Sequence, residues 1–219
     1  MTTAIQQILK RPDAPKHLAT LQKALADEAE RRQSFYNWIE EDVKAEFING
    51  EIILHSPVKR RHLRVSEQLS RILSVYAQLK KRGTMMIEKA MIALTRNDYE
   101  PDIVFFKREK AALFQDDQML FPAPDFVVEI LSKGTARKDK GIKKEDYALH
   151  GVKEYWIIDP IKQTIEQYLL INSTDTEYFP PYIYRIDDDI ESHVVEGFKI
   201  PVRAIFEEEA NLEAMKNLF

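Results

Sequence analysis

The chain of 219 residues contains no cysteine, which excludes a disulfide framework and any metal site built from thiolates. It has only six glycines, and they form no glycine-rich loop of the kind that holds nucleotide phosphates. No apolar run approaches the ~20 residues of a membrane-spanning helix, and the N-terminus lacks the apolar segment of a signal peptide. We therefore expect a cytoplasmic protein without a membrane partner.

The sequence also lacks an excess of positive charge, because 32 Lys and Arg residues stand against 36 Asp and Glu residues, for a formal net charge of -4. This balance excludes a polycation that binds nucleic acid with its whole surface. Binding would require a local basic patch. Residues 133–144, which read KGTARKDKGIKK, provide such a patch.

The order of the predicted elements indicates one mixed α/β domain, over residues 34–219, preceded by a helical extension, residues 1–33. In the extension, Leu18, Leu21 and Leu25 have helical spacing, which we interpret as an arm that packs on the body or on a second copy. In the domain, strands and helices alternate through the centre. Strands are predicted over 44–48, 51–55, 85–94, 100–107, 124–132 and 152–160, and helices over 61–80, 139–150 and 203–217. Residues 164–171, 182–186 and 192–200 are predicted as further strands or hairpin arms.

One predicted strand, PDFVVEILS at residues 124–132, carries an acid in an apolar setting. An ionised carboxylate is costly to bury alone, so Glu129 needs a metal, a cation or hydrogen-bond donors. Asp125 lies four residues away, roughly 13 Å along a strand, which is too far to share one metal ion. We expect the partner on a neighbouring strand, and Asp102, at the start of the buried run DIVFF, is the best candidate.

Two carboxylates on adjacent strands, with a backbone carbonyl such as that of Ile130, would suit Mg²⁺, a cation that prefers oxygen ligands and keeps several waters. A nearby lysine would orient the water and stabilise phosphate charge. The predicted helix after the strand offers Lys143, with Lys144 as the second choice. Asp139, Lys143 and Tyr147 fall on one helical face, because they are four residues apart.

Several stretches together resemble the PD-(D/E)XK nuclease superfamily and, more narrowly, its Uma-two family of restriction-endonuclease-like proteins. They are FINGEIILHSP with Glu46 just before it, His62, Pro101-Asp102, PDFVVEILSKGT and DKGIKKEDYALHGVKEYWIIDP. The resemblance covers roughly residues 34–200 and leaves the arm outside. It implies a restriction-endonuclease-like core, in which Asp102 and Glu129 bind the metal.

The resemblance also implies further roles for individual residues. Leu131 stands where the wider superfamily carries its lysine, and the Uma-two pattern replaces that lysine by one on the following helix, which is Lys143 here. Glu46 either pairs within its hairpin or joins the metal site through water. His62 and Tyr147 are expected to support the site rather than to react. Lys133-Gly134 stands where relatives often carry Pro-Ser.

These features predict a Mg²⁺-dependent endonuclease acting on DNA, with Mn²⁺ as a substitute metal and a homodimer as the working unit. Five residues beside the acids would contact phosphates: Lys133, Arg137, Lys138, Lys140 and Lys144. Each could instead be an ordinary solvated charge. Two alternatives remain open: an inactive nuclease fold that binds nucleic acid or a protein, and a metal-dependent hydrolase of another phosphate or of a small molecule.

Overall fold

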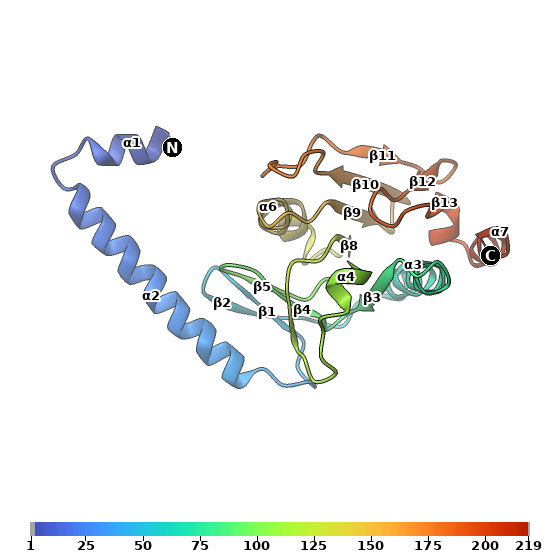
Figure 1. Ribbon diagram of the computed structural model, residues 1–219, viewed down its shortest axis with the longest axis horizontal. Helices are drawn as coiled ribbons and strands as arrows, with labels where there is room; N and C mark the ends of the chain where they lie inside the picture. Colours follow the sequence, from blue (N-terminus) through green and yellow to red (C-terminus); the bar gives the residue numbers. More distant parts are fainter. Residues whose placement is uncertain (1–2, 219) are drawn as a thin grey trace.

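The computed structural model describes residues 3–218, which form a mixed α/β body with a helical arm at the N-terminus (Figure 1). The helices are α1 (Thr3–Leu9), α2 (Ala14–Trp38), α3 (Arg60–Leu79), α4 (Arg108–Ala111), α5 (Ala136–Lys138), α6 (Lys144–Leu149) and α7 (Glu208–Leu218). A π-helical turn spans Asp139–Lys143, and a 3-10 turn spans Val202–Ile205. No helix in the described part of the chain is long and apolar enough to cross a membrane.

A six-stranded sheet forms the centre of the body, in the order β11-β10-β9-β8-β6-β3. Its strands are β3 (Gly83–Ile87), β6 (Ile103–Lys107), β8 (Phe126–Ile130), β9 (Glu154–Asp159), β10 (Thr164–Leu169) and β11 (Tyr182–Tyr184). Strands β8 and β9 are parallel, joined by a crossover through α5, the π-helical turn and α6, and the other pairs are antiparallel. One face packs on α3 and the C-terminal elements, in a core that includes Leu69, Trp156 and Phe198.

A five-stranded sheet covers part of the other face, in the order β2-β1-β5-β4-β7. Its strands are β1 (Ala45–Ile48), β2 (Glu51–Leu54), β4 (Met91–Ala93), β5 (Asp98–Tyr99) and β7 (Leu120–Phe121). A second core, with Val127, Tyr147, Tyr155 and Ile157, fills the space between this sheet, the central sheet and α6. The candidate site lies where the two sheets meet.

Most of the predicted elements are present. The Asn49-Gly50 turn joins β1 to β2 as a two-residue hairpin, and both residues have positive φ, 51° and 84°, as a type I′ turn requires. The predicted strand over 85–94 is divided into β3 and β4, because Glu88 and Lys89 also have positive φ.

The predicted strand over 192–200 is wrong for most of its length. Only β12 (Asp189–Glu191) and β13 (Lys199–Pro201) pair in this region. Ser192 Oγ accepts hydrogen bonds from the backbone N–H groups of Val194 and Val195, and this local turn replaces strand pairing.

The N-terminal arm consists of α1 and α2, and Figure 1 shows the start of α2 well away from the body. Helix α2 runs without interruption from Ala14 to Trp38. Its C-terminal part docks on the body, where Phe35 is fully buried beside Phe47 with ring centroids 5.7 Å apart. The domain boundary at residues 33 and 34 falls within this helix and stays a prediction.

Candidate active site

Asp102 and Glu129 lie next to each other on adjacent antiparallel strands. The ladder between β6 and β8 pairs Val104 with Val127 and Ile103 with Val128. Asp102 and Glu129 follow directly on the two sides of the last pair, so their side chains emerge on the same face. This is the arrangement that the sequence predicts for the two acids.

In each acid, one carboxylate oxygen interacts with neighbouring groups of the protein. Asp102 Oδ2 accepts a hydrogen bond from the backbone N–H of Ile130 (2.7 Å) and lies 3.2 Å from His62 Nε2. Glu129 Oε1 accepts hydrogen bonds from Lys143 Nζ (2.8 Å) and Tyr147 Oη (3.2 Å). No described residue donates to Asp102 Oδ1 or Glu129 Oε2, so one oxygen of each acid is available to a ligand.

Lys143 connects the two sheets through their acids. Its ammonium lies 2.7 Å from Glu46 Oε1, on β1 of the five-stranded sheet, and 2.8 Å from Glu129 Oε1, on β8 of the central sheet. Its side chain is only 2% exposed. The crossover reaches inward at this point because Gly141 takes a non-helical conformation within the π-helical turn.

Asp139 belongs to the same cluster, and the predicted shared face of Asp139, Lys143 and Tyr147 is confirmed. Asp139 Oδ1 lies 3.6 Å from Lys143 Nζ, one turn away. The carboxylate is fully buried. Neither oxygen makes a close hydrogen bond among residues 3–218, and the groups that interact with it are the more distant Lys143 ammonium and the Thr135 side chain. A buried carboxylate whose oxygens are incompletely used indicates a ligand, a functional role or strain.

Glu46 is held from three sides. Besides Lys143, its Oε1 accepts a hydrogen bond from the backbone N–H of Glu100 (3.1 Å), and its Oε2 lies 3.4 Å from His55 Nε2. Glu100 lies on the segment that leads from β5 to Asp102. Glu46 therefore fixes this segment and the lysine together.

Burial and the single ammonium of Lys143 give the acids of the cluster different pKa values. Burial alone would raise the pKa of Glu46, but Lys143 and His55 lower it to about 2. Burial raises the pKa of Glu129 well above its ordinary value, with only partial compensation by Lys143. Burial also raises the pKa of Asp139. Burial disfavours the ammonium of Lys143, yet Glu129 and Glu46 raise its pKa overall, so it stays charged.

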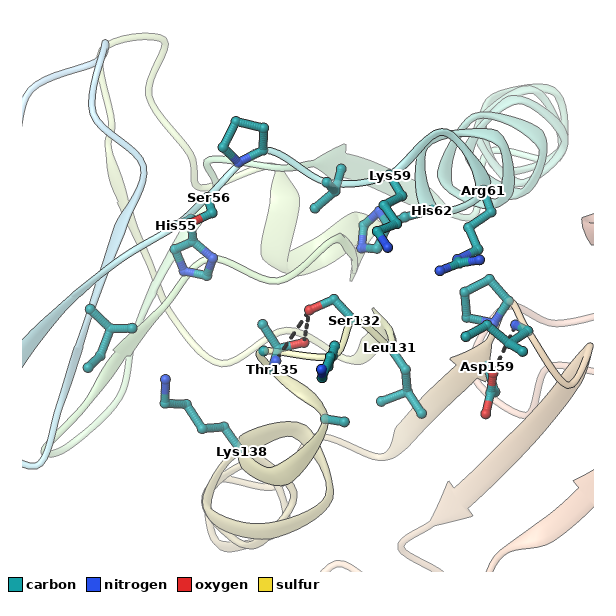
Figure 2. A pocket seen from close by; sticks show the side chains of 18 of the residues that line it. His55, Ser56, Lys59, Arg61, His62, Leu131, Ser132, Thr135, Lys138 and Asp159 are labelled. Carbon is teal, nitrogen blue, oxygen red and sulfur yellow. Dashed lines mark hydrogen bonds between the residues drawn. The ribbon is translucent and has the colours of Figure 1, made fainter.

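A cleft of about 630 Å³ opens onto the cluster, and Glu46, His62 and Lys143 form part of its wall. Figure 2 shows His55 on one side and Arg61 and His62 on the helix opposite, with Ser132 and Thr135 between them. Ser132 Oγ accepts a hydrogen bond from the backbone N–H of Thr135 (3.2 Å), which shapes the turn in the cleft wall.

The comparisons with known proteins identify the family of the chain. The family model described as "Uma2: Putative restriction endonuclease" matches residues 32–203. The chain belongs to the Uma2 family. Protein sll1609 of Synechocystis sp., described as uncharacterized, is 28% identical over 127 residues, which are 57% of this chain and 71% of that protein.

A solved structure shares the fold of this Uma2 chain. It is described as a "putative nuclease belonging to DUF820" from Anabaena variabilis, and the TM-score is 0.67 with 17% sequence identity. The match covers 78% of this chain and 94% of that one. The mixed α/β architecture is therefore the one found in that structure.

The five basic residues named from the Uma2 sequence separate into two groups in space. Lys133 and Lys138 line the cleft, and Arg137 is exposed on α5 between them in the sequence. Lys140 instead pairs with Glu166 on β10, and the Lys144 ammonium lies 5.3 Å from the centre of the Tyr168 ring, also on β10. Lys140 and Lys144 do not line the cleft.

Other residues of the cleft were not selected from the sequence. Lys59 and Arg61 line it at the start of α3, and the run KRRHLR at residues 59–64 is a basic signal that could have drawn attention to them. His55 lies beside Glu46, and its place directly after β2 was the available signal. Asp139 was assigned to the face of Lys143 but was given no role.

The donor set of the cluster suits a hard cation. The acidic side chains offer carboxylate oxygens, and Asp102 Oδ1 and Glu129 Oε2 accept no hydrogen bond from the described residues. Asp139 interacts with the Lys143 ammonium at 3.6 Å and with the Thr135 side chain. Within residues 3–218, however, no three His, Asp or Glu side chains are already arranged to hold a metal. Any metal held here would therefore have at most two of these carboxylates as ligands, with waters completing its coordination, as is usual for Mg²⁺.

Proposed function

We propose that this Uma2 chain is a Mg²⁺-dependent endonuclease that hydrolyses phosphodiester bonds in DNA. The observation that carries the proposal is the convergence of Asp102, Glu129 and Lys143 in one cluster, of which Lys143 lines the cleft. Asp102 lies directly before β6, Glu129 lies on β8 and Lys143 ends the π-helical turn, so their meeting is a property of the fold. Family membership supports a nuclease.

Asp102 and Glu129 would hold the metal with their uncommitted oxygens, and the carbonyl of Ile130 is the proposed third ligand. Bound Mg²⁺ supplies an activated water and neutralises charge on the phosphate. Lys143 positions Glu129 and offers positive charge to the phosphate, while Glu46 positions Lys143. His62 holds Asp102 in place from the start of α3.

DNA would approach through the cleft along its basic wall. Lys133 and Lys138 lie on the crossover side, and Lys59 and Arg61 lie on the α3 side. Positive groups on both sides of the acids can hold a phosphate backbone over them and offset the negative charge of the whole chain. The expected homodimer is a separate matter, because it depends on the N-terminal arm and not on the acidic cluster.

The test is cleavage by the purified chain. Supercoiled plasmid, linear duplex, single strands and a branched junction would be incubated with Mg²⁺, Mn²⁺ or EDTA. We expect metal-dependent cutting by the wild type and none by the Asp102→Ala/Glu129→Ala variant. Asp116→Ala/Asp117→Ala, which removes two exposed loop acids, is the matched control and should cut normally. Cutting by the Asp102→Ala/Glu129→Ala variant, or in EDTA, would refute the proposal.

One observation favours a second candidate, a module that holds nucleic acid without cutting it. The Lys143 ammonium already pairs with Glu46 and Glu129, and a cation in that position reduces the need for a metal. In this case the folded chain would bind the same nucleic acids without cleavage, and calorimetry would detect no Mn²⁺ binding. Mn²⁺ binding that is lost in the Asp102→Ala/Glu129→Ala variant would argue against it.

A further inference from the structure

Helix α2 carries one continuous seam of residues, only part of which is covered. Spacings of four and three residues alternate along it, as in the a and d positions of a coiled coil: Ala14, Leu18, Leu21, Leu25, Glu28, Arg32 and Phe35. A narrow seam of this kind fits a second helix. The spacing therefore indicates that the element that packs on this face is another helix.

The C-terminal half of the seam is covered by the body of the same chain. Glu28 accepts hydrogen bonds from Arg96 (2.6 and 2.8 Å), Arg32 pairs with Asp98 (2.7 Å), and Phe35 is fully buried. The N-terminal half continues the same face beyond the edge of the body. There, Leu18, Leu21 and Leu25 are 57%, 56% and 53% exposed.

We infer that this free seam, formed by the half-buried Ala14 and the exposed Leu18, Leu21 and Leu25, pairs antiparallel with the free seam of a second copy of the chain. The inference does not rest on the proposed nuclease function. The family match begins at residue 32, so the free seam lies outside the part of the chain that the family shares.

The length of the free seam matches itself in the antiparallel direction. If Leu18 packs on the partner's Leu21, then Leu25 packs on the partner's Ala14. Each of the four seam residues then contacts a seam residue of the partner, which gives four layers of paired residues. Ala14 is the first residue of α2, so the partner helix ends one layer before Glu28, where the body begins. A parallel partner would continue past this point into the body.

The charges along α2 also permit self-pairing. Between residues 15 and 24, the positions that flank the seam are Pro15, His17, Gln22 and Ala24. They carry no fixed charge, so two identical helices do not repel one another there. The charged residues lie on the opposite face of the helix, toward solvent: Lys16, Lys23, Asp27 and Glu30.

The first test measures association of the full chain by sedimentation velocity. We expect a dimer at about 100 μM, and a monomer when Leu18→Glu and Leu21→Glu place two charges in the seam. Ala19→Glu/Ala26→Glu adds the same two charges at exposed positions outside the seam, and this variant should remain a dimer. The melting temperature shows that the bodies stay folded. A monomeric wild type, or a dimer that survives Leu18→Glu/Leu21→Glu, would overturn the inference.

The second test determines whether the two helices pair parallel or antiparallel. Because the chain has no native cysteine, only the introduced cysteines can form disulfides. Ala14→Cys/Leu25→Cys should form a disulfide-linked dimer on mild oxidation, because these positions face each other between copies. Within one helix they are about 16 Å apart, so they cannot pair with each other. Leu25→Cys alone should stay uncrosslinked in the antiparallel dimer, and efficient crosslinking of this single variant would instead show a parallel arrangement.

Discussion

Two buried glutamates on neighbouring strands of the central sheet have opposite surroundings. Glu129 on β8 and Glu154 on β9 are both almost inaccessible. The parallel register pairs Glu129 with Ile157 and Glu154 with Phe126, so the two acids point to opposite faces. Both lie in apolar runs, VVEIL and VKEYWII, and burial raises the pKa of both.

The difference lies in what satisfies the carboxylates. Glu154 accepts four hydrogen bonds from neutral donors, which fill both oxygens: Trp156 Nε1 and Gln167 Nε2 on Oε1, and Ser192 Oγ and Val194 N on Oε2. Glu129 receives a lysine and a tyrosine on one oxygen and nothing from the described residues on the other. A buried acid therefore suggests a ligand site only when its hydrogen-bonding capacity is incompletely used.

The largest expected effect separates the two acids by function. Glu129→Gln should lower metal-dependent cleavage at least ~100-fold, because it removes a charged metal ligand. Glu154→Gln should leave cleavage within about twofold, because Glu154 lies on the other face. The measurement is the plasmid assay under single-turnover conditions. Equal losses in the two variants would mean that the distinction drawn between these acids is incorrect.

In a stability measurement, Glu154→Gln should have the larger effect and Glu129→Gln the smaller, the reverse of their effects on cleavage. Glu154→Gln places an amide N–H₂ among donors and should cost about 1–3 kcal/mol of unfolding free energy. Glu129→Gln replaces a carboxyl whose raised pKa favours its neutral form and which accepts two hydrogen bonds rather than four. It should therefore change the unfolding free energy of the metal-free protein by less. Urea denaturation at pH 7 in EDTA gives both values. A smaller cost for Glu154→Gln than for Glu129→Gln would contradict this assignment.

Lys143→Met tests whether the ammonium holds the acidic cluster together. It leaves Glu46, Glu129 and Asp139 buried without their cation, and removing one partner of a buried pair costs about 3–5 kcal/mol. Lys133→Met changes an exposed lysine of the same cleft and should cost less than about 0.5 kcal/mol. Urea denaturation compares them, and similar values for both would show that the cluster does not depend on Lys143.

The raised pKa of Glu129 predicts how stability changes with pH in the absence of metal. The folded state holds the proton at pH values where the unfolded carboxyl, with its ordinary pKa of 4.5, has lost it. The unfolding free energy should therefore fall as pH rises above 4.5, by at most about 1.4 kcal/mol per unit for one proton. Denaturation from pH 5 to 9 in EDTA should show a smaller fall in Glu129→Gln. Identical slopes would rule out this protonation.

The smallest effect concerns the basic residues on the two sides of the crossover. Lys138→Ala should reduce the slope of log binding constant against log salt concentration by about 1, because it removes one phosphate contact. Lys140→Ala should leave the slope unchanged, because Lys140 pairs with Glu166. Binding of a catalytically inactive variant to a labelled duplex at several salt concentrations measures this. A loss of slope in Lys140→Ala alone would place the DNA on the β10 side.

Local patterns in the sequence predicted much of the fold and part of the site. The Asn49-Gly50 turn, the spacing of α3 and the apolar strands are short-range features, and they are present. The adjacency of Asp102 and Glu129 followed from the cost of burying an acid alone. The predicted strand over 192–200 failed because Ser192 forms a local turn, a side-chain preference that apolar periodicity does not report.

The sequence by itself determined the alternation of elements, the family and the residue types of the cluster, because these depend on composition and on neighbours in the chain. Only the tertiary structure decided which acids have unused oxygens, since donors such as Lys143 and Ser192 come from distant segments. It also decided that Lys138 lines the cleft, whereas Lys140, two residues away, pairs with Glu166 on β10. Long-range packing sets the environment of a side chain, and the environment distinguishes Glu129 from Glu154.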